Sequence, residues 1–224
     1  INFVAQSTFK NKFMDQQKEH LKNLSEIRSL MESSTKFLSL SGLAGVFIGI
    51  IALCGAVVAY LYLSLDIFSD NYYIHLSRGQ VFNFGNVAFF VTDAIIVLIL
   101  ALTAGTIFTI RKAHKNGQAV WNAAVKKFLI NLFIPLIAGG LFCLVLLYYH
   151  VIILIAPAML VFYGISLVSA SVFTFKVIRY LGYSEIILGL AACFFVGYGL
   201  IFWAVGFGFL HIIYGIVMRI KYER

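Results

Sequence analysis

The arrangement of the chain depends on residues 183–218, which read YSEIILGLAACFFVGYGLIFWAVGFGFLHIIYGIVM. This stretch is almost entirely apolar, but it is too long for one membrane-spanning helix and short for two. One long tilted helix would give the chain five spans, whereas a break near Phe202 to Ala204 gives it six. The positively charged residues decide between these two arrangements.

Most lysines and arginines lie in short segments between apolar runs. With six spans all of these clusters fall on one side of the membrane, whereas with five spans the C-terminal cluster falls on the other side. Bacterial membrane proteins keep an excess of Lys and Arg in their cytoplasmic loops. We therefore predict six spans in a bacterial inner membrane, with both termini cytoplasmic. The clusters comprise Lys10, Lys12, Lys18, Lys22, Arg28 and Lys36, then Arg111, Lys112, Lys115, Lys126 and Lys127, then Lys176 and Arg179, and finally Arg219, Lys221 and Arg224.

The composition agrees with a membrane protein. The chain is 62% hydrophobic and 12% charged, and its mean hydropathy is +0.95, whereas about a quarter of the residues in a soluble domain are charged. The net charge of +8 would fit a nucleic-acid partner, but its location between the apolar runs argues against one. The fold class that follows is all-α: a polytopic bundle of six transmembrane helices surrounded by lipid.

The predicted domains follow from the apolar runs. Residues 1–36 form a polar cytoplasmic segment without a signal-peptide pattern, and because the chain starts at Ile1 rather than Met we expect further sequence upstream. Residues 37–220 form the transmembrane domain, and residues 221–224 form a cytoplasmic tail. The six spans are expected at about 37–63, 85–110, 128–148, 151–174, 184–201 and 204–219.

Apolar residues recur at roughly helical spacing from about Thr8 to Met31, which predicts an amphipathic N-terminal helix. Such a helix either lies on the anionic inner leaflet or docks on a partner protein or a second protomer. The first span carries a stripe of small residues that share one face, and such stripes let membrane helices pack closely. We favour internal packing of this stripe over dimerisation. Its members include Gly45, Gly49, Ala52 and Ala56.

Two polar residues lie deep in predicted spans. Asp93 is about 12 Å into the second span, and an ionised carboxylate in lipid costs at least about 3 kcal/mol. His211 lies at a similar depth in the sixth span, so the two side chains would meet if these spans are neighbours. The pair would form a proton-carrying or cation-binding site, or alternatively a structural polar clasp.

Three further residues are secondary candidates. Glu185 is placed at the cytoplasmic start of the fifth span, where the helix dipole favours an acid and a structural role. Asn131 precedes Pro135 by four residues and is expected to satisfy a backbone group that the proline frees. His150 lies in a very short turn at the outer face.

No catalytic, nucleotide-binding or metal-binding motif is present in the sequence, and the three cysteines lie singly in apolar runs. We therefore expect no catalytic residue, no metal and no cofactor. Haem would need two histidines that face each other, and His211 has no obvious partner.

Several strings resemble a family of six-span bacterial inner-membrane proteins with no known activity. They are ESSTKFLSLSGLAGVFIGIIAL at 32–53, IAPAMLVFYGISLVSAS at 155–171, RYLGYSEIILGL at 179–190 and GYGLIFWAVGFGFLHIIYGIVM at 197–218. The likeness extends from about Ile27 to Glu223, apart from the outer loop from Ser64 to Asn83. It implies a helical inner-membrane bundle, without implying a role for any residue.

Three functions remain open from the sequence. The first is a non-enzymatic protein that acts through interaction with proteins or lipids, as a sensor, an assembly factor or a membrane subunit, with a partner protein or as a homo-oligomer. The second is a small transporter of protons, ions or solutes centred on Asp93 and His211. The third is a redox subunit associated with haem or a quinone.

Overall fold

The computed structural model describes residues 40–63, 84–117, 119–195 and 197–223, and this part of the chain consists of helices and short turns without a β-strand. The predicted N-terminal helix between Thr8 and Met31 lies outside the described residues. So does the loop between the first two spans.

Six helical segments are long and apolar enough to cross a membrane, and they fit a multi-pass membrane protein. Two of these segments are composite: one joins η1, α6 and η2, and the other joins α8, η3 and α9. The elements are α2 (Gly42–Leu63), α4 (Phe84–Lys115), α5 (Ala123–Tyr148), η1 (Ile152–Leu154), α6 (Ile155–Ala170), η2 (Ser171–Phe173), α7 (Lys176–Phe194), α8 (Gly199–Trp203), η3 (Ala204–Leu210) and α9 (His211–Tyr222).

The last two spans begin earlier in the chain than the sequence pattern predicted. The fifth span begins at Lys176 rather than near residue 184, and it ends at Phe194, before α8 begins at Gly199. Gly197 has a φ of 98° there, a conformation that glycine adopts at little cost. The expected break near Phe202 to Ala204 is instead continuous helix, where α8 leads directly into η3.

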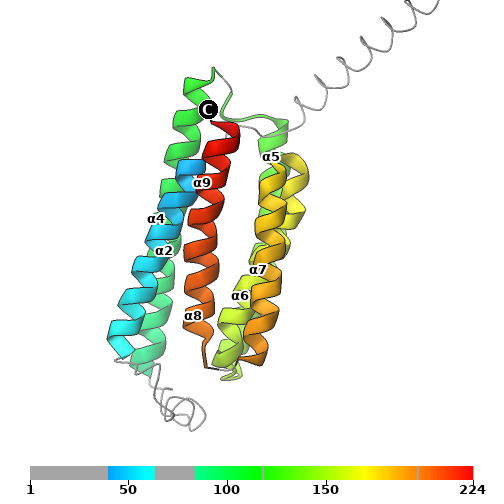
Figure 1. The fold of residues 1–224 in the computed structure, drawn as a ribbon. Helices are drawn as coiled ribbons and strands as arrows, with labels where there is room; N and C mark the ends of the chain where they lie inside the picture. Colours follow the sequence, from blue (N-terminus) through cyan, green and yellow to red (C-terminus); the bar gives the residue numbers. More distant parts are fainter. Residues whose placement is uncertain (1–39, 64–83, 118, 196, 224) are drawn as a thin grey trace, which may run out of the picture. The chain divides into compact units, whose positions relative to one another are not determined.

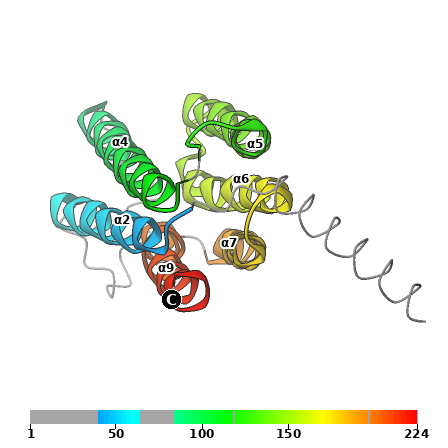
Figure 2. The same cartoon turned by 90° about the horizontal axis from the view of Figure 1, so that it is seen from above.

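The last span contacts two groups of helices. Figure 2 shows α9 beside α2 on one flank and beside α7 on the other. α2 packs in turn against α4, while α6 packs against both α5 and α7. In Figure 1 the helices run roughly side by side, so the ends of α4 and α9 lie near the starts of α2, α5 and α7. The last span therefore joins the two groups.

Glycines allow backbones to touch at the main contacts. A Cβ added at Gly164 of α6 would lie 2.6 Å from the carbonyl oxygen of Gly182 in α7, and one added at Gly42 would lie 2.6 Å from the carbonyl oxygen of Gly215 in α9. Neither position has room for a side chain. Lipid-embedded helices gain association energy from such close approach, since apolar side chains are equally well solvated by lipid.

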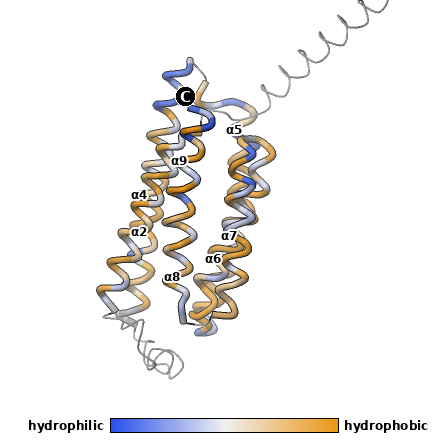
Figure 3. The backbone as a smooth tube through the Cα atoms, viewed as in Figure 1, coloured by the Kyte–Doolittle hydropathy of each residue, from blue (hydrophilic) through white to orange (hydrophobic). Residues whose placement is uncertain are grey.

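The outer surface of the helices is apolar, and the hydrophilic residues gather at one end. Ile134 and Leu141 on α5 are 65% and 59% exposed, and Phe194 on α7 is 86% exposed. Figure 3 shows hydrophilic segments at the end where α4 and α9 finish and α5 begins. This pattern fits a lipid-facing belt with a polar, basic end.

The contact between α6 and α7 yields a prediction. We expect Gly164→Ala to lower the free energy of unfolding by about 1–3 kcal/mol, because the new methyl group forces the two helices apart. Gly140→Ala is the matched control, because a Cβ at this glycine of α5 meets no atom within 4 Å. Thermal unfolding in one detergent compares the two variants, and equal midpoints would contradict the prediction.

Candidate functional site

Glu185 is a fully buried acid in the middle of α7. The helix begins at Lys176, so Glu185 is not in a first helical turn, and the sequence-based placement at the start of the span was wrong. Its side chain is 0% exposed. Arg179, a basic residue in the first turns of α7, donates from Nε to the hydroxyl of Ser171, 3.1 Å away. Neither the helix dipole nor Arg179 therefore accounts for this acid.

His211, the first residue of α9, faces Glu185 from the last span. Its Nδ1 lies 3.0 Å from the carbonyl oxygen of Gly206, and its Nε2 lies 2.7 Å from the hydroxyl oxygen of Tyr163 in α6. A carbonyl can only accept, so these partners assign the hydrogen of the neutral ring to Nδ1. Nε2 then accepts a hydrogen bond from Tyr163. Both ring nitrogens are thus satisfied without Glu185.

The carboxyl group of Glu185 has no hydrogen-bond partner among the described residues, and this holds for both of its oxygens. Nδ1 of His211 lies 3.6 Å from Oε1, which is too long for a hydrogen bond. A Cβ at Gly206 would lie 2.5 Å from Oε2 and would also press on Leu160 and Leu188. The acid therefore lies in tightly packed, apolar surroundings. This is unusual, because most buried polar groups in proteins have at least one hydrogen-bond partner.

The backbone beside Glu185 is unusual as well. η3 is a π-helical segment, and Gly206 is its third residue. π-Helical turns are rare and frequently occur at functional sites. The same stretch holds Phe207, whose ring lies 5.0 Å from that of Tyr163 and 6.1 Å from that of His211. The irregular turn positions both the glycine and the histidine against the acid.

Asp93 and His211 are not joined by a hydrogen bond or ion pair in the part of the chain that the structure describes. Asp93 lies on α4 beside α2, where a Cβ at Gly55 would be 3.6 Å from its Oδ2. α4 packs chiefly on α2, whereas His211 is bonded to Tyr163 of α6 and to Gly206. The carboxylate nearest to His211 is that of Glu185.

The other predicted residues lie apart from this cluster. Asn131 donates to the carbonyl of Lys127 and accepts from the hydroxyl of Ser169, so its side chain links α5 to α6 rather than supporting the backbone at Pro135. His150 lies in the turn after α5 with a φ of 61°.

The small-residue stripe of α2 faces the last span. Gly45 lies against Gly215 and Tyr214, and Gly49 lies against Gly208 and Ile212. Ala52 and Ala56 are buried.

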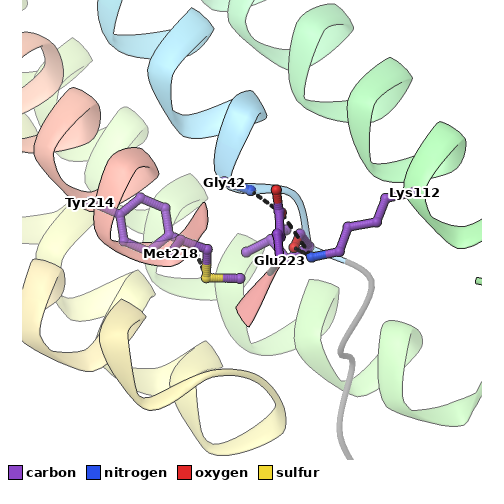
Figure 4. A network of polar contacts seen from close by, with 6 residues as sticks. Gly42, Lys112, Tyr214, Met218 and Glu223 are labelled. Carbon is purple, nitrogen blue, oxygen red and sulfur yellow. Dashed lines mark hydrogen bonds and ion pairs between the residues drawn. The ribbon is translucent and has the colours of Figure 1, made fainter. Parts of the chain in front are cut away.

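A second polar cluster closes the basic end of the helices. The carboxylate of Glu223 accepts from the backbone N–H of Gly42 at 2.6 Å and from Nζ of Lys112 at 2.9 Å. Lys112 also donates to the carbonyl of Leu40 at 2.7 Å. Figure 4 shows Lys112 reaching across from α4 to Glu223 beside the start of α2. We call this set of contacts the terminal clasp, because it ties together α2, α4 and the end of α9.

The terminal clasp is electrostatically favourable. Burial raises the pKa of Glu223, but the hydrogen bonds from Lys112, Gly42 and Ser41 and the charge of Lys112 lower it more, so its pKa lies below the usual 4.5. Only 13% of the Lys112 side chain and 15% of the Glu223 side chain are exposed, so solvent screens this pair weakly.

Sequence reasoning found His211 but missed Tyr163 and misjudged Glu185. The apolar run around Glu185 contained the necessary signal, because a span that starts at Lys176 puts this acid near mid-helix.

In the described residues no group of three or more His, Cys, Asp and Glu side chains is arranged to bind a metal ion. Comparison with known proteins found no matching family model, curated protein or solved structure, so the family resemblance remains an expectation.

The terminal clasp yields a prediction about pH. We expect Glu223→Gln to lower the free energy of unfolding at neutral pH by about 1–2 kcal/mol, since it removes a charge-assisted hydrogen bond. The pKa of Glu223 is lowered by folding, so the stabilisation is present above pH 4.5 and is lost as the pH falls through the lower, folded-state value. The free energies of unfolding of the wild type and of Glu223→Gln should therefore become equal at acidic pH.

Unfolding midpoints measured in detergent between neutral and acidic pH test this expectation. Lys115→Gln is the control, because it removes an exposed charge from the same end of α4. A difference between wild type and Glu223→Gln that persists unchanged into acid would contradict the assignment.

Proposed function

We propose that this chain is a small, non-enzymatic protein of the bacterial inner membrane that binds and releases a proton at Glu185 and couples this exchange to the movement of an ion or solute. The observation that carries the proposal is the buried carboxyl group of Glu185, neither oxygen of which has a hydrogen-bond partner among the described residues. Ionisable groups inside membrane spans are costly, and they are commonly retained where protons or ions move.

A purely structural role fits Glu185 poorly. A structural polar clasp satisfies its donors and acceptors, as the terminal clasp does for Glu223. Glu185 instead faces a histidine whose Nδ1 already bonds to Gly206. Removing an acid from water without a partner destabilises a protein, so its presence at the centre of three packed helices calls for a functional reason.

A proton fits this setting better than a metal ion does. A metal ion would need four or more ligands, whereas Glu185 and His211 supply two ionisable side chains here. The carboxyl group is also packed tightly against Gly206 and Leu160, which limits the room for a larger cation. A proton needs no additional space, and it removes the charge that the apolar surroundings disfavour.

The orientation of the chain is part of the proposal. The end that carries the terminal clasp also holds the basic residues of α4, α5, α7 and α9, and we assign this end, together with both termini, to the cytoplasm. The first function considered from the sequence was interaction with a partner, and the N-terminal helix expected to bind that partner lies outside the described ranges. The small-residue stripe of α2 packs against the last span, so it gives that function no support.

The proposal predicts that Glu185 carries an exchangeable proton. In infrared difference spectra of the protein in bilayers, we expect a protonated carboxyl band that disappears on deprotonation. Glu185→Gln should abolish this band and reduce proton flux into proteoliposomes to the level of empty vesicles.

Asp93→Asn is the matched control, since it removes the other acid within a span, and it should retain the Glu185 band. A titrating band that survives in Glu185→Gln, or that vanishes in Asp93→Asn, would overturn the assignment to Glu185.

A further inference from the structure

His211 has one Nδ1 hydrogen but two acceptors in reach. The carbonyl oxygen of Gly206 is 3.0 Å from Nδ1, and Oε1 of Glu185 is 3.6 Å from the same atom. The opposite nitrogen, Nε2, is held 2.7 Å from the hydroxyl of Tyr163. The ring is therefore anchored at Nε2 and has a choice of partner at Nδ1.

The protonation state of Glu185 determines which of the two acceptors, its own carboxyl group or the carbonyl of Gly206, forms the stronger hydrogen bond with Nδ1 of His211. A protonated carboxyl group competes poorly with the nearer carbonyl of Gly206, so the observed geometry corresponds to that state. A carboxylate is a charged acceptor, and charge-assisted hydrogen bonds are about twice as strong as neutral ones. A movement of about 0.8 Å brings Nδ1 from 3.6 Å to hydrogen-bond distance of Oε1.

We infer that His211 is a two-position hydrogen-bond switch, which bonds to Gly206 when Glu185 is protonated and to Glu185 when the proton has left to the aqueous phase. This inference rests on the proposed proton exchange at Glu185, and it specifies which hydrogen bond changes when the proton leaves. Tyr163 is a positioning residue: by donating to Nε2 it keeps the hydrogen of the neutral imidazole on Nδ1.

The switch acts on the backbone of η3. Gly206 lies inside this π-helical segment, and its carbonyl loses the His211 bond when the ring turns to Glu185. Two residues later, Gly208 packs directly against the side chain of Leu53 in α2. A change in η3 therefore reaches the contact between the last span and α2, so loss of the proton is transmitted from α7 to the other group of helices.

Few other titratable groups face this site. The elements packed on α7 contribute Tyr163 from α6, and His211 and Tyr214 from α9, whereas η2, α8 and η3 contribute none. The hydroxyl of Tyr214 donates to Sδ of Met218, 3.7 Å away. Among these described groups, Glu185 is thus the one whose change of charge alters the hydrogen bonding of His211.

The test is NMR of the full chain in nanodiscs with ¹⁵N-labelled histidine. The chain has five histidines, so the signal of His211 is assigned by its loss in His211→Gln. We expect one Nδ1–H signal that shifts downfield over the pH range in which the infrared band of Glu185 disappears. In Glu185→Gln, which cannot ionise, the signal should keep one position at every pH.

Tyr163→Phe tests the positioning role. It removes the donor to Nε2, so we expect the Nδ1–H signal to weaken and an Nε2–H signal to appear. A tyrosine that merely fills space would leave the His211 signals unchanged, and this result would overturn the role assigned to Tyr163.

The outcomes separate the switch from the proposed function. If the band of Glu185 titrates while the Nδ1–H signal of wild type stays in place, the switch is overturned and proton exchange stands. If no band that is lost in Glu185→Gln titrates at any pH at which the protein stays folded, proton exchange at Glu185 is overturned, and the switch falls with it.

Discussion

The close approach of the last span to its neighbours is the constraint on which the rest of the structure depends. Its glycines face two directions: Gly206 presses on Glu185 and Leu160, whereas Gly208 and Gly215 press on Leu53 and Val46 of α2. Any side chain at these positions would separate the helices, and lipid offers no hydrophobic force to bring them back together. The same contact therefore joins the two groups of helices and seals the acid away from water.

The two polar clusters of the described residues solve opposite problems. At the basic end, Glu223 is bonded to Lys112 and Gly42, so its charge is compensated and the helix ends are held together. In the middle of the bundle, Glu185 is buried without such compensation. The first arrangement favours one fixed geometry. The second leaves an acid whose charge state alters the hydrogen bonding around it, which is the physical basis for treating Glu185 and His211 as a functional pair.

His211 was identified from the sequence as a candidate residue, but its partner was not. Its depth in an apolar run marked it as a polar group in need of a partner, but the proposed partner, Asp93, was chosen by depth alone. Depth fixes one coordinate along the membrane normal, whereas contact also requires the right neighbouring helix and the right face. α4 packs chiefly against α2, and the carboxylate nearest to His211 comes from α7. Tyr163 gave no signal in the sequence, because a tyrosine in a span is unremarkable until its hydroxyl meets a specific acceptor.

The sequence by itself determined the six apolar spans, because a helix must cover a fixed thickness of hydrocarbon and the distribution of Lys and Arg distinguishes six spans from five. Local chemistry also set the turn after α5 at Tyr149 and His150. Only the tertiary structure decided which helices touch, where the last span begins and which polar groups meet. These outcomes depend on glycine contacts and on the π-helical turn of η3, which bring together residues far apart in the chain, and no local pattern encodes such pairings.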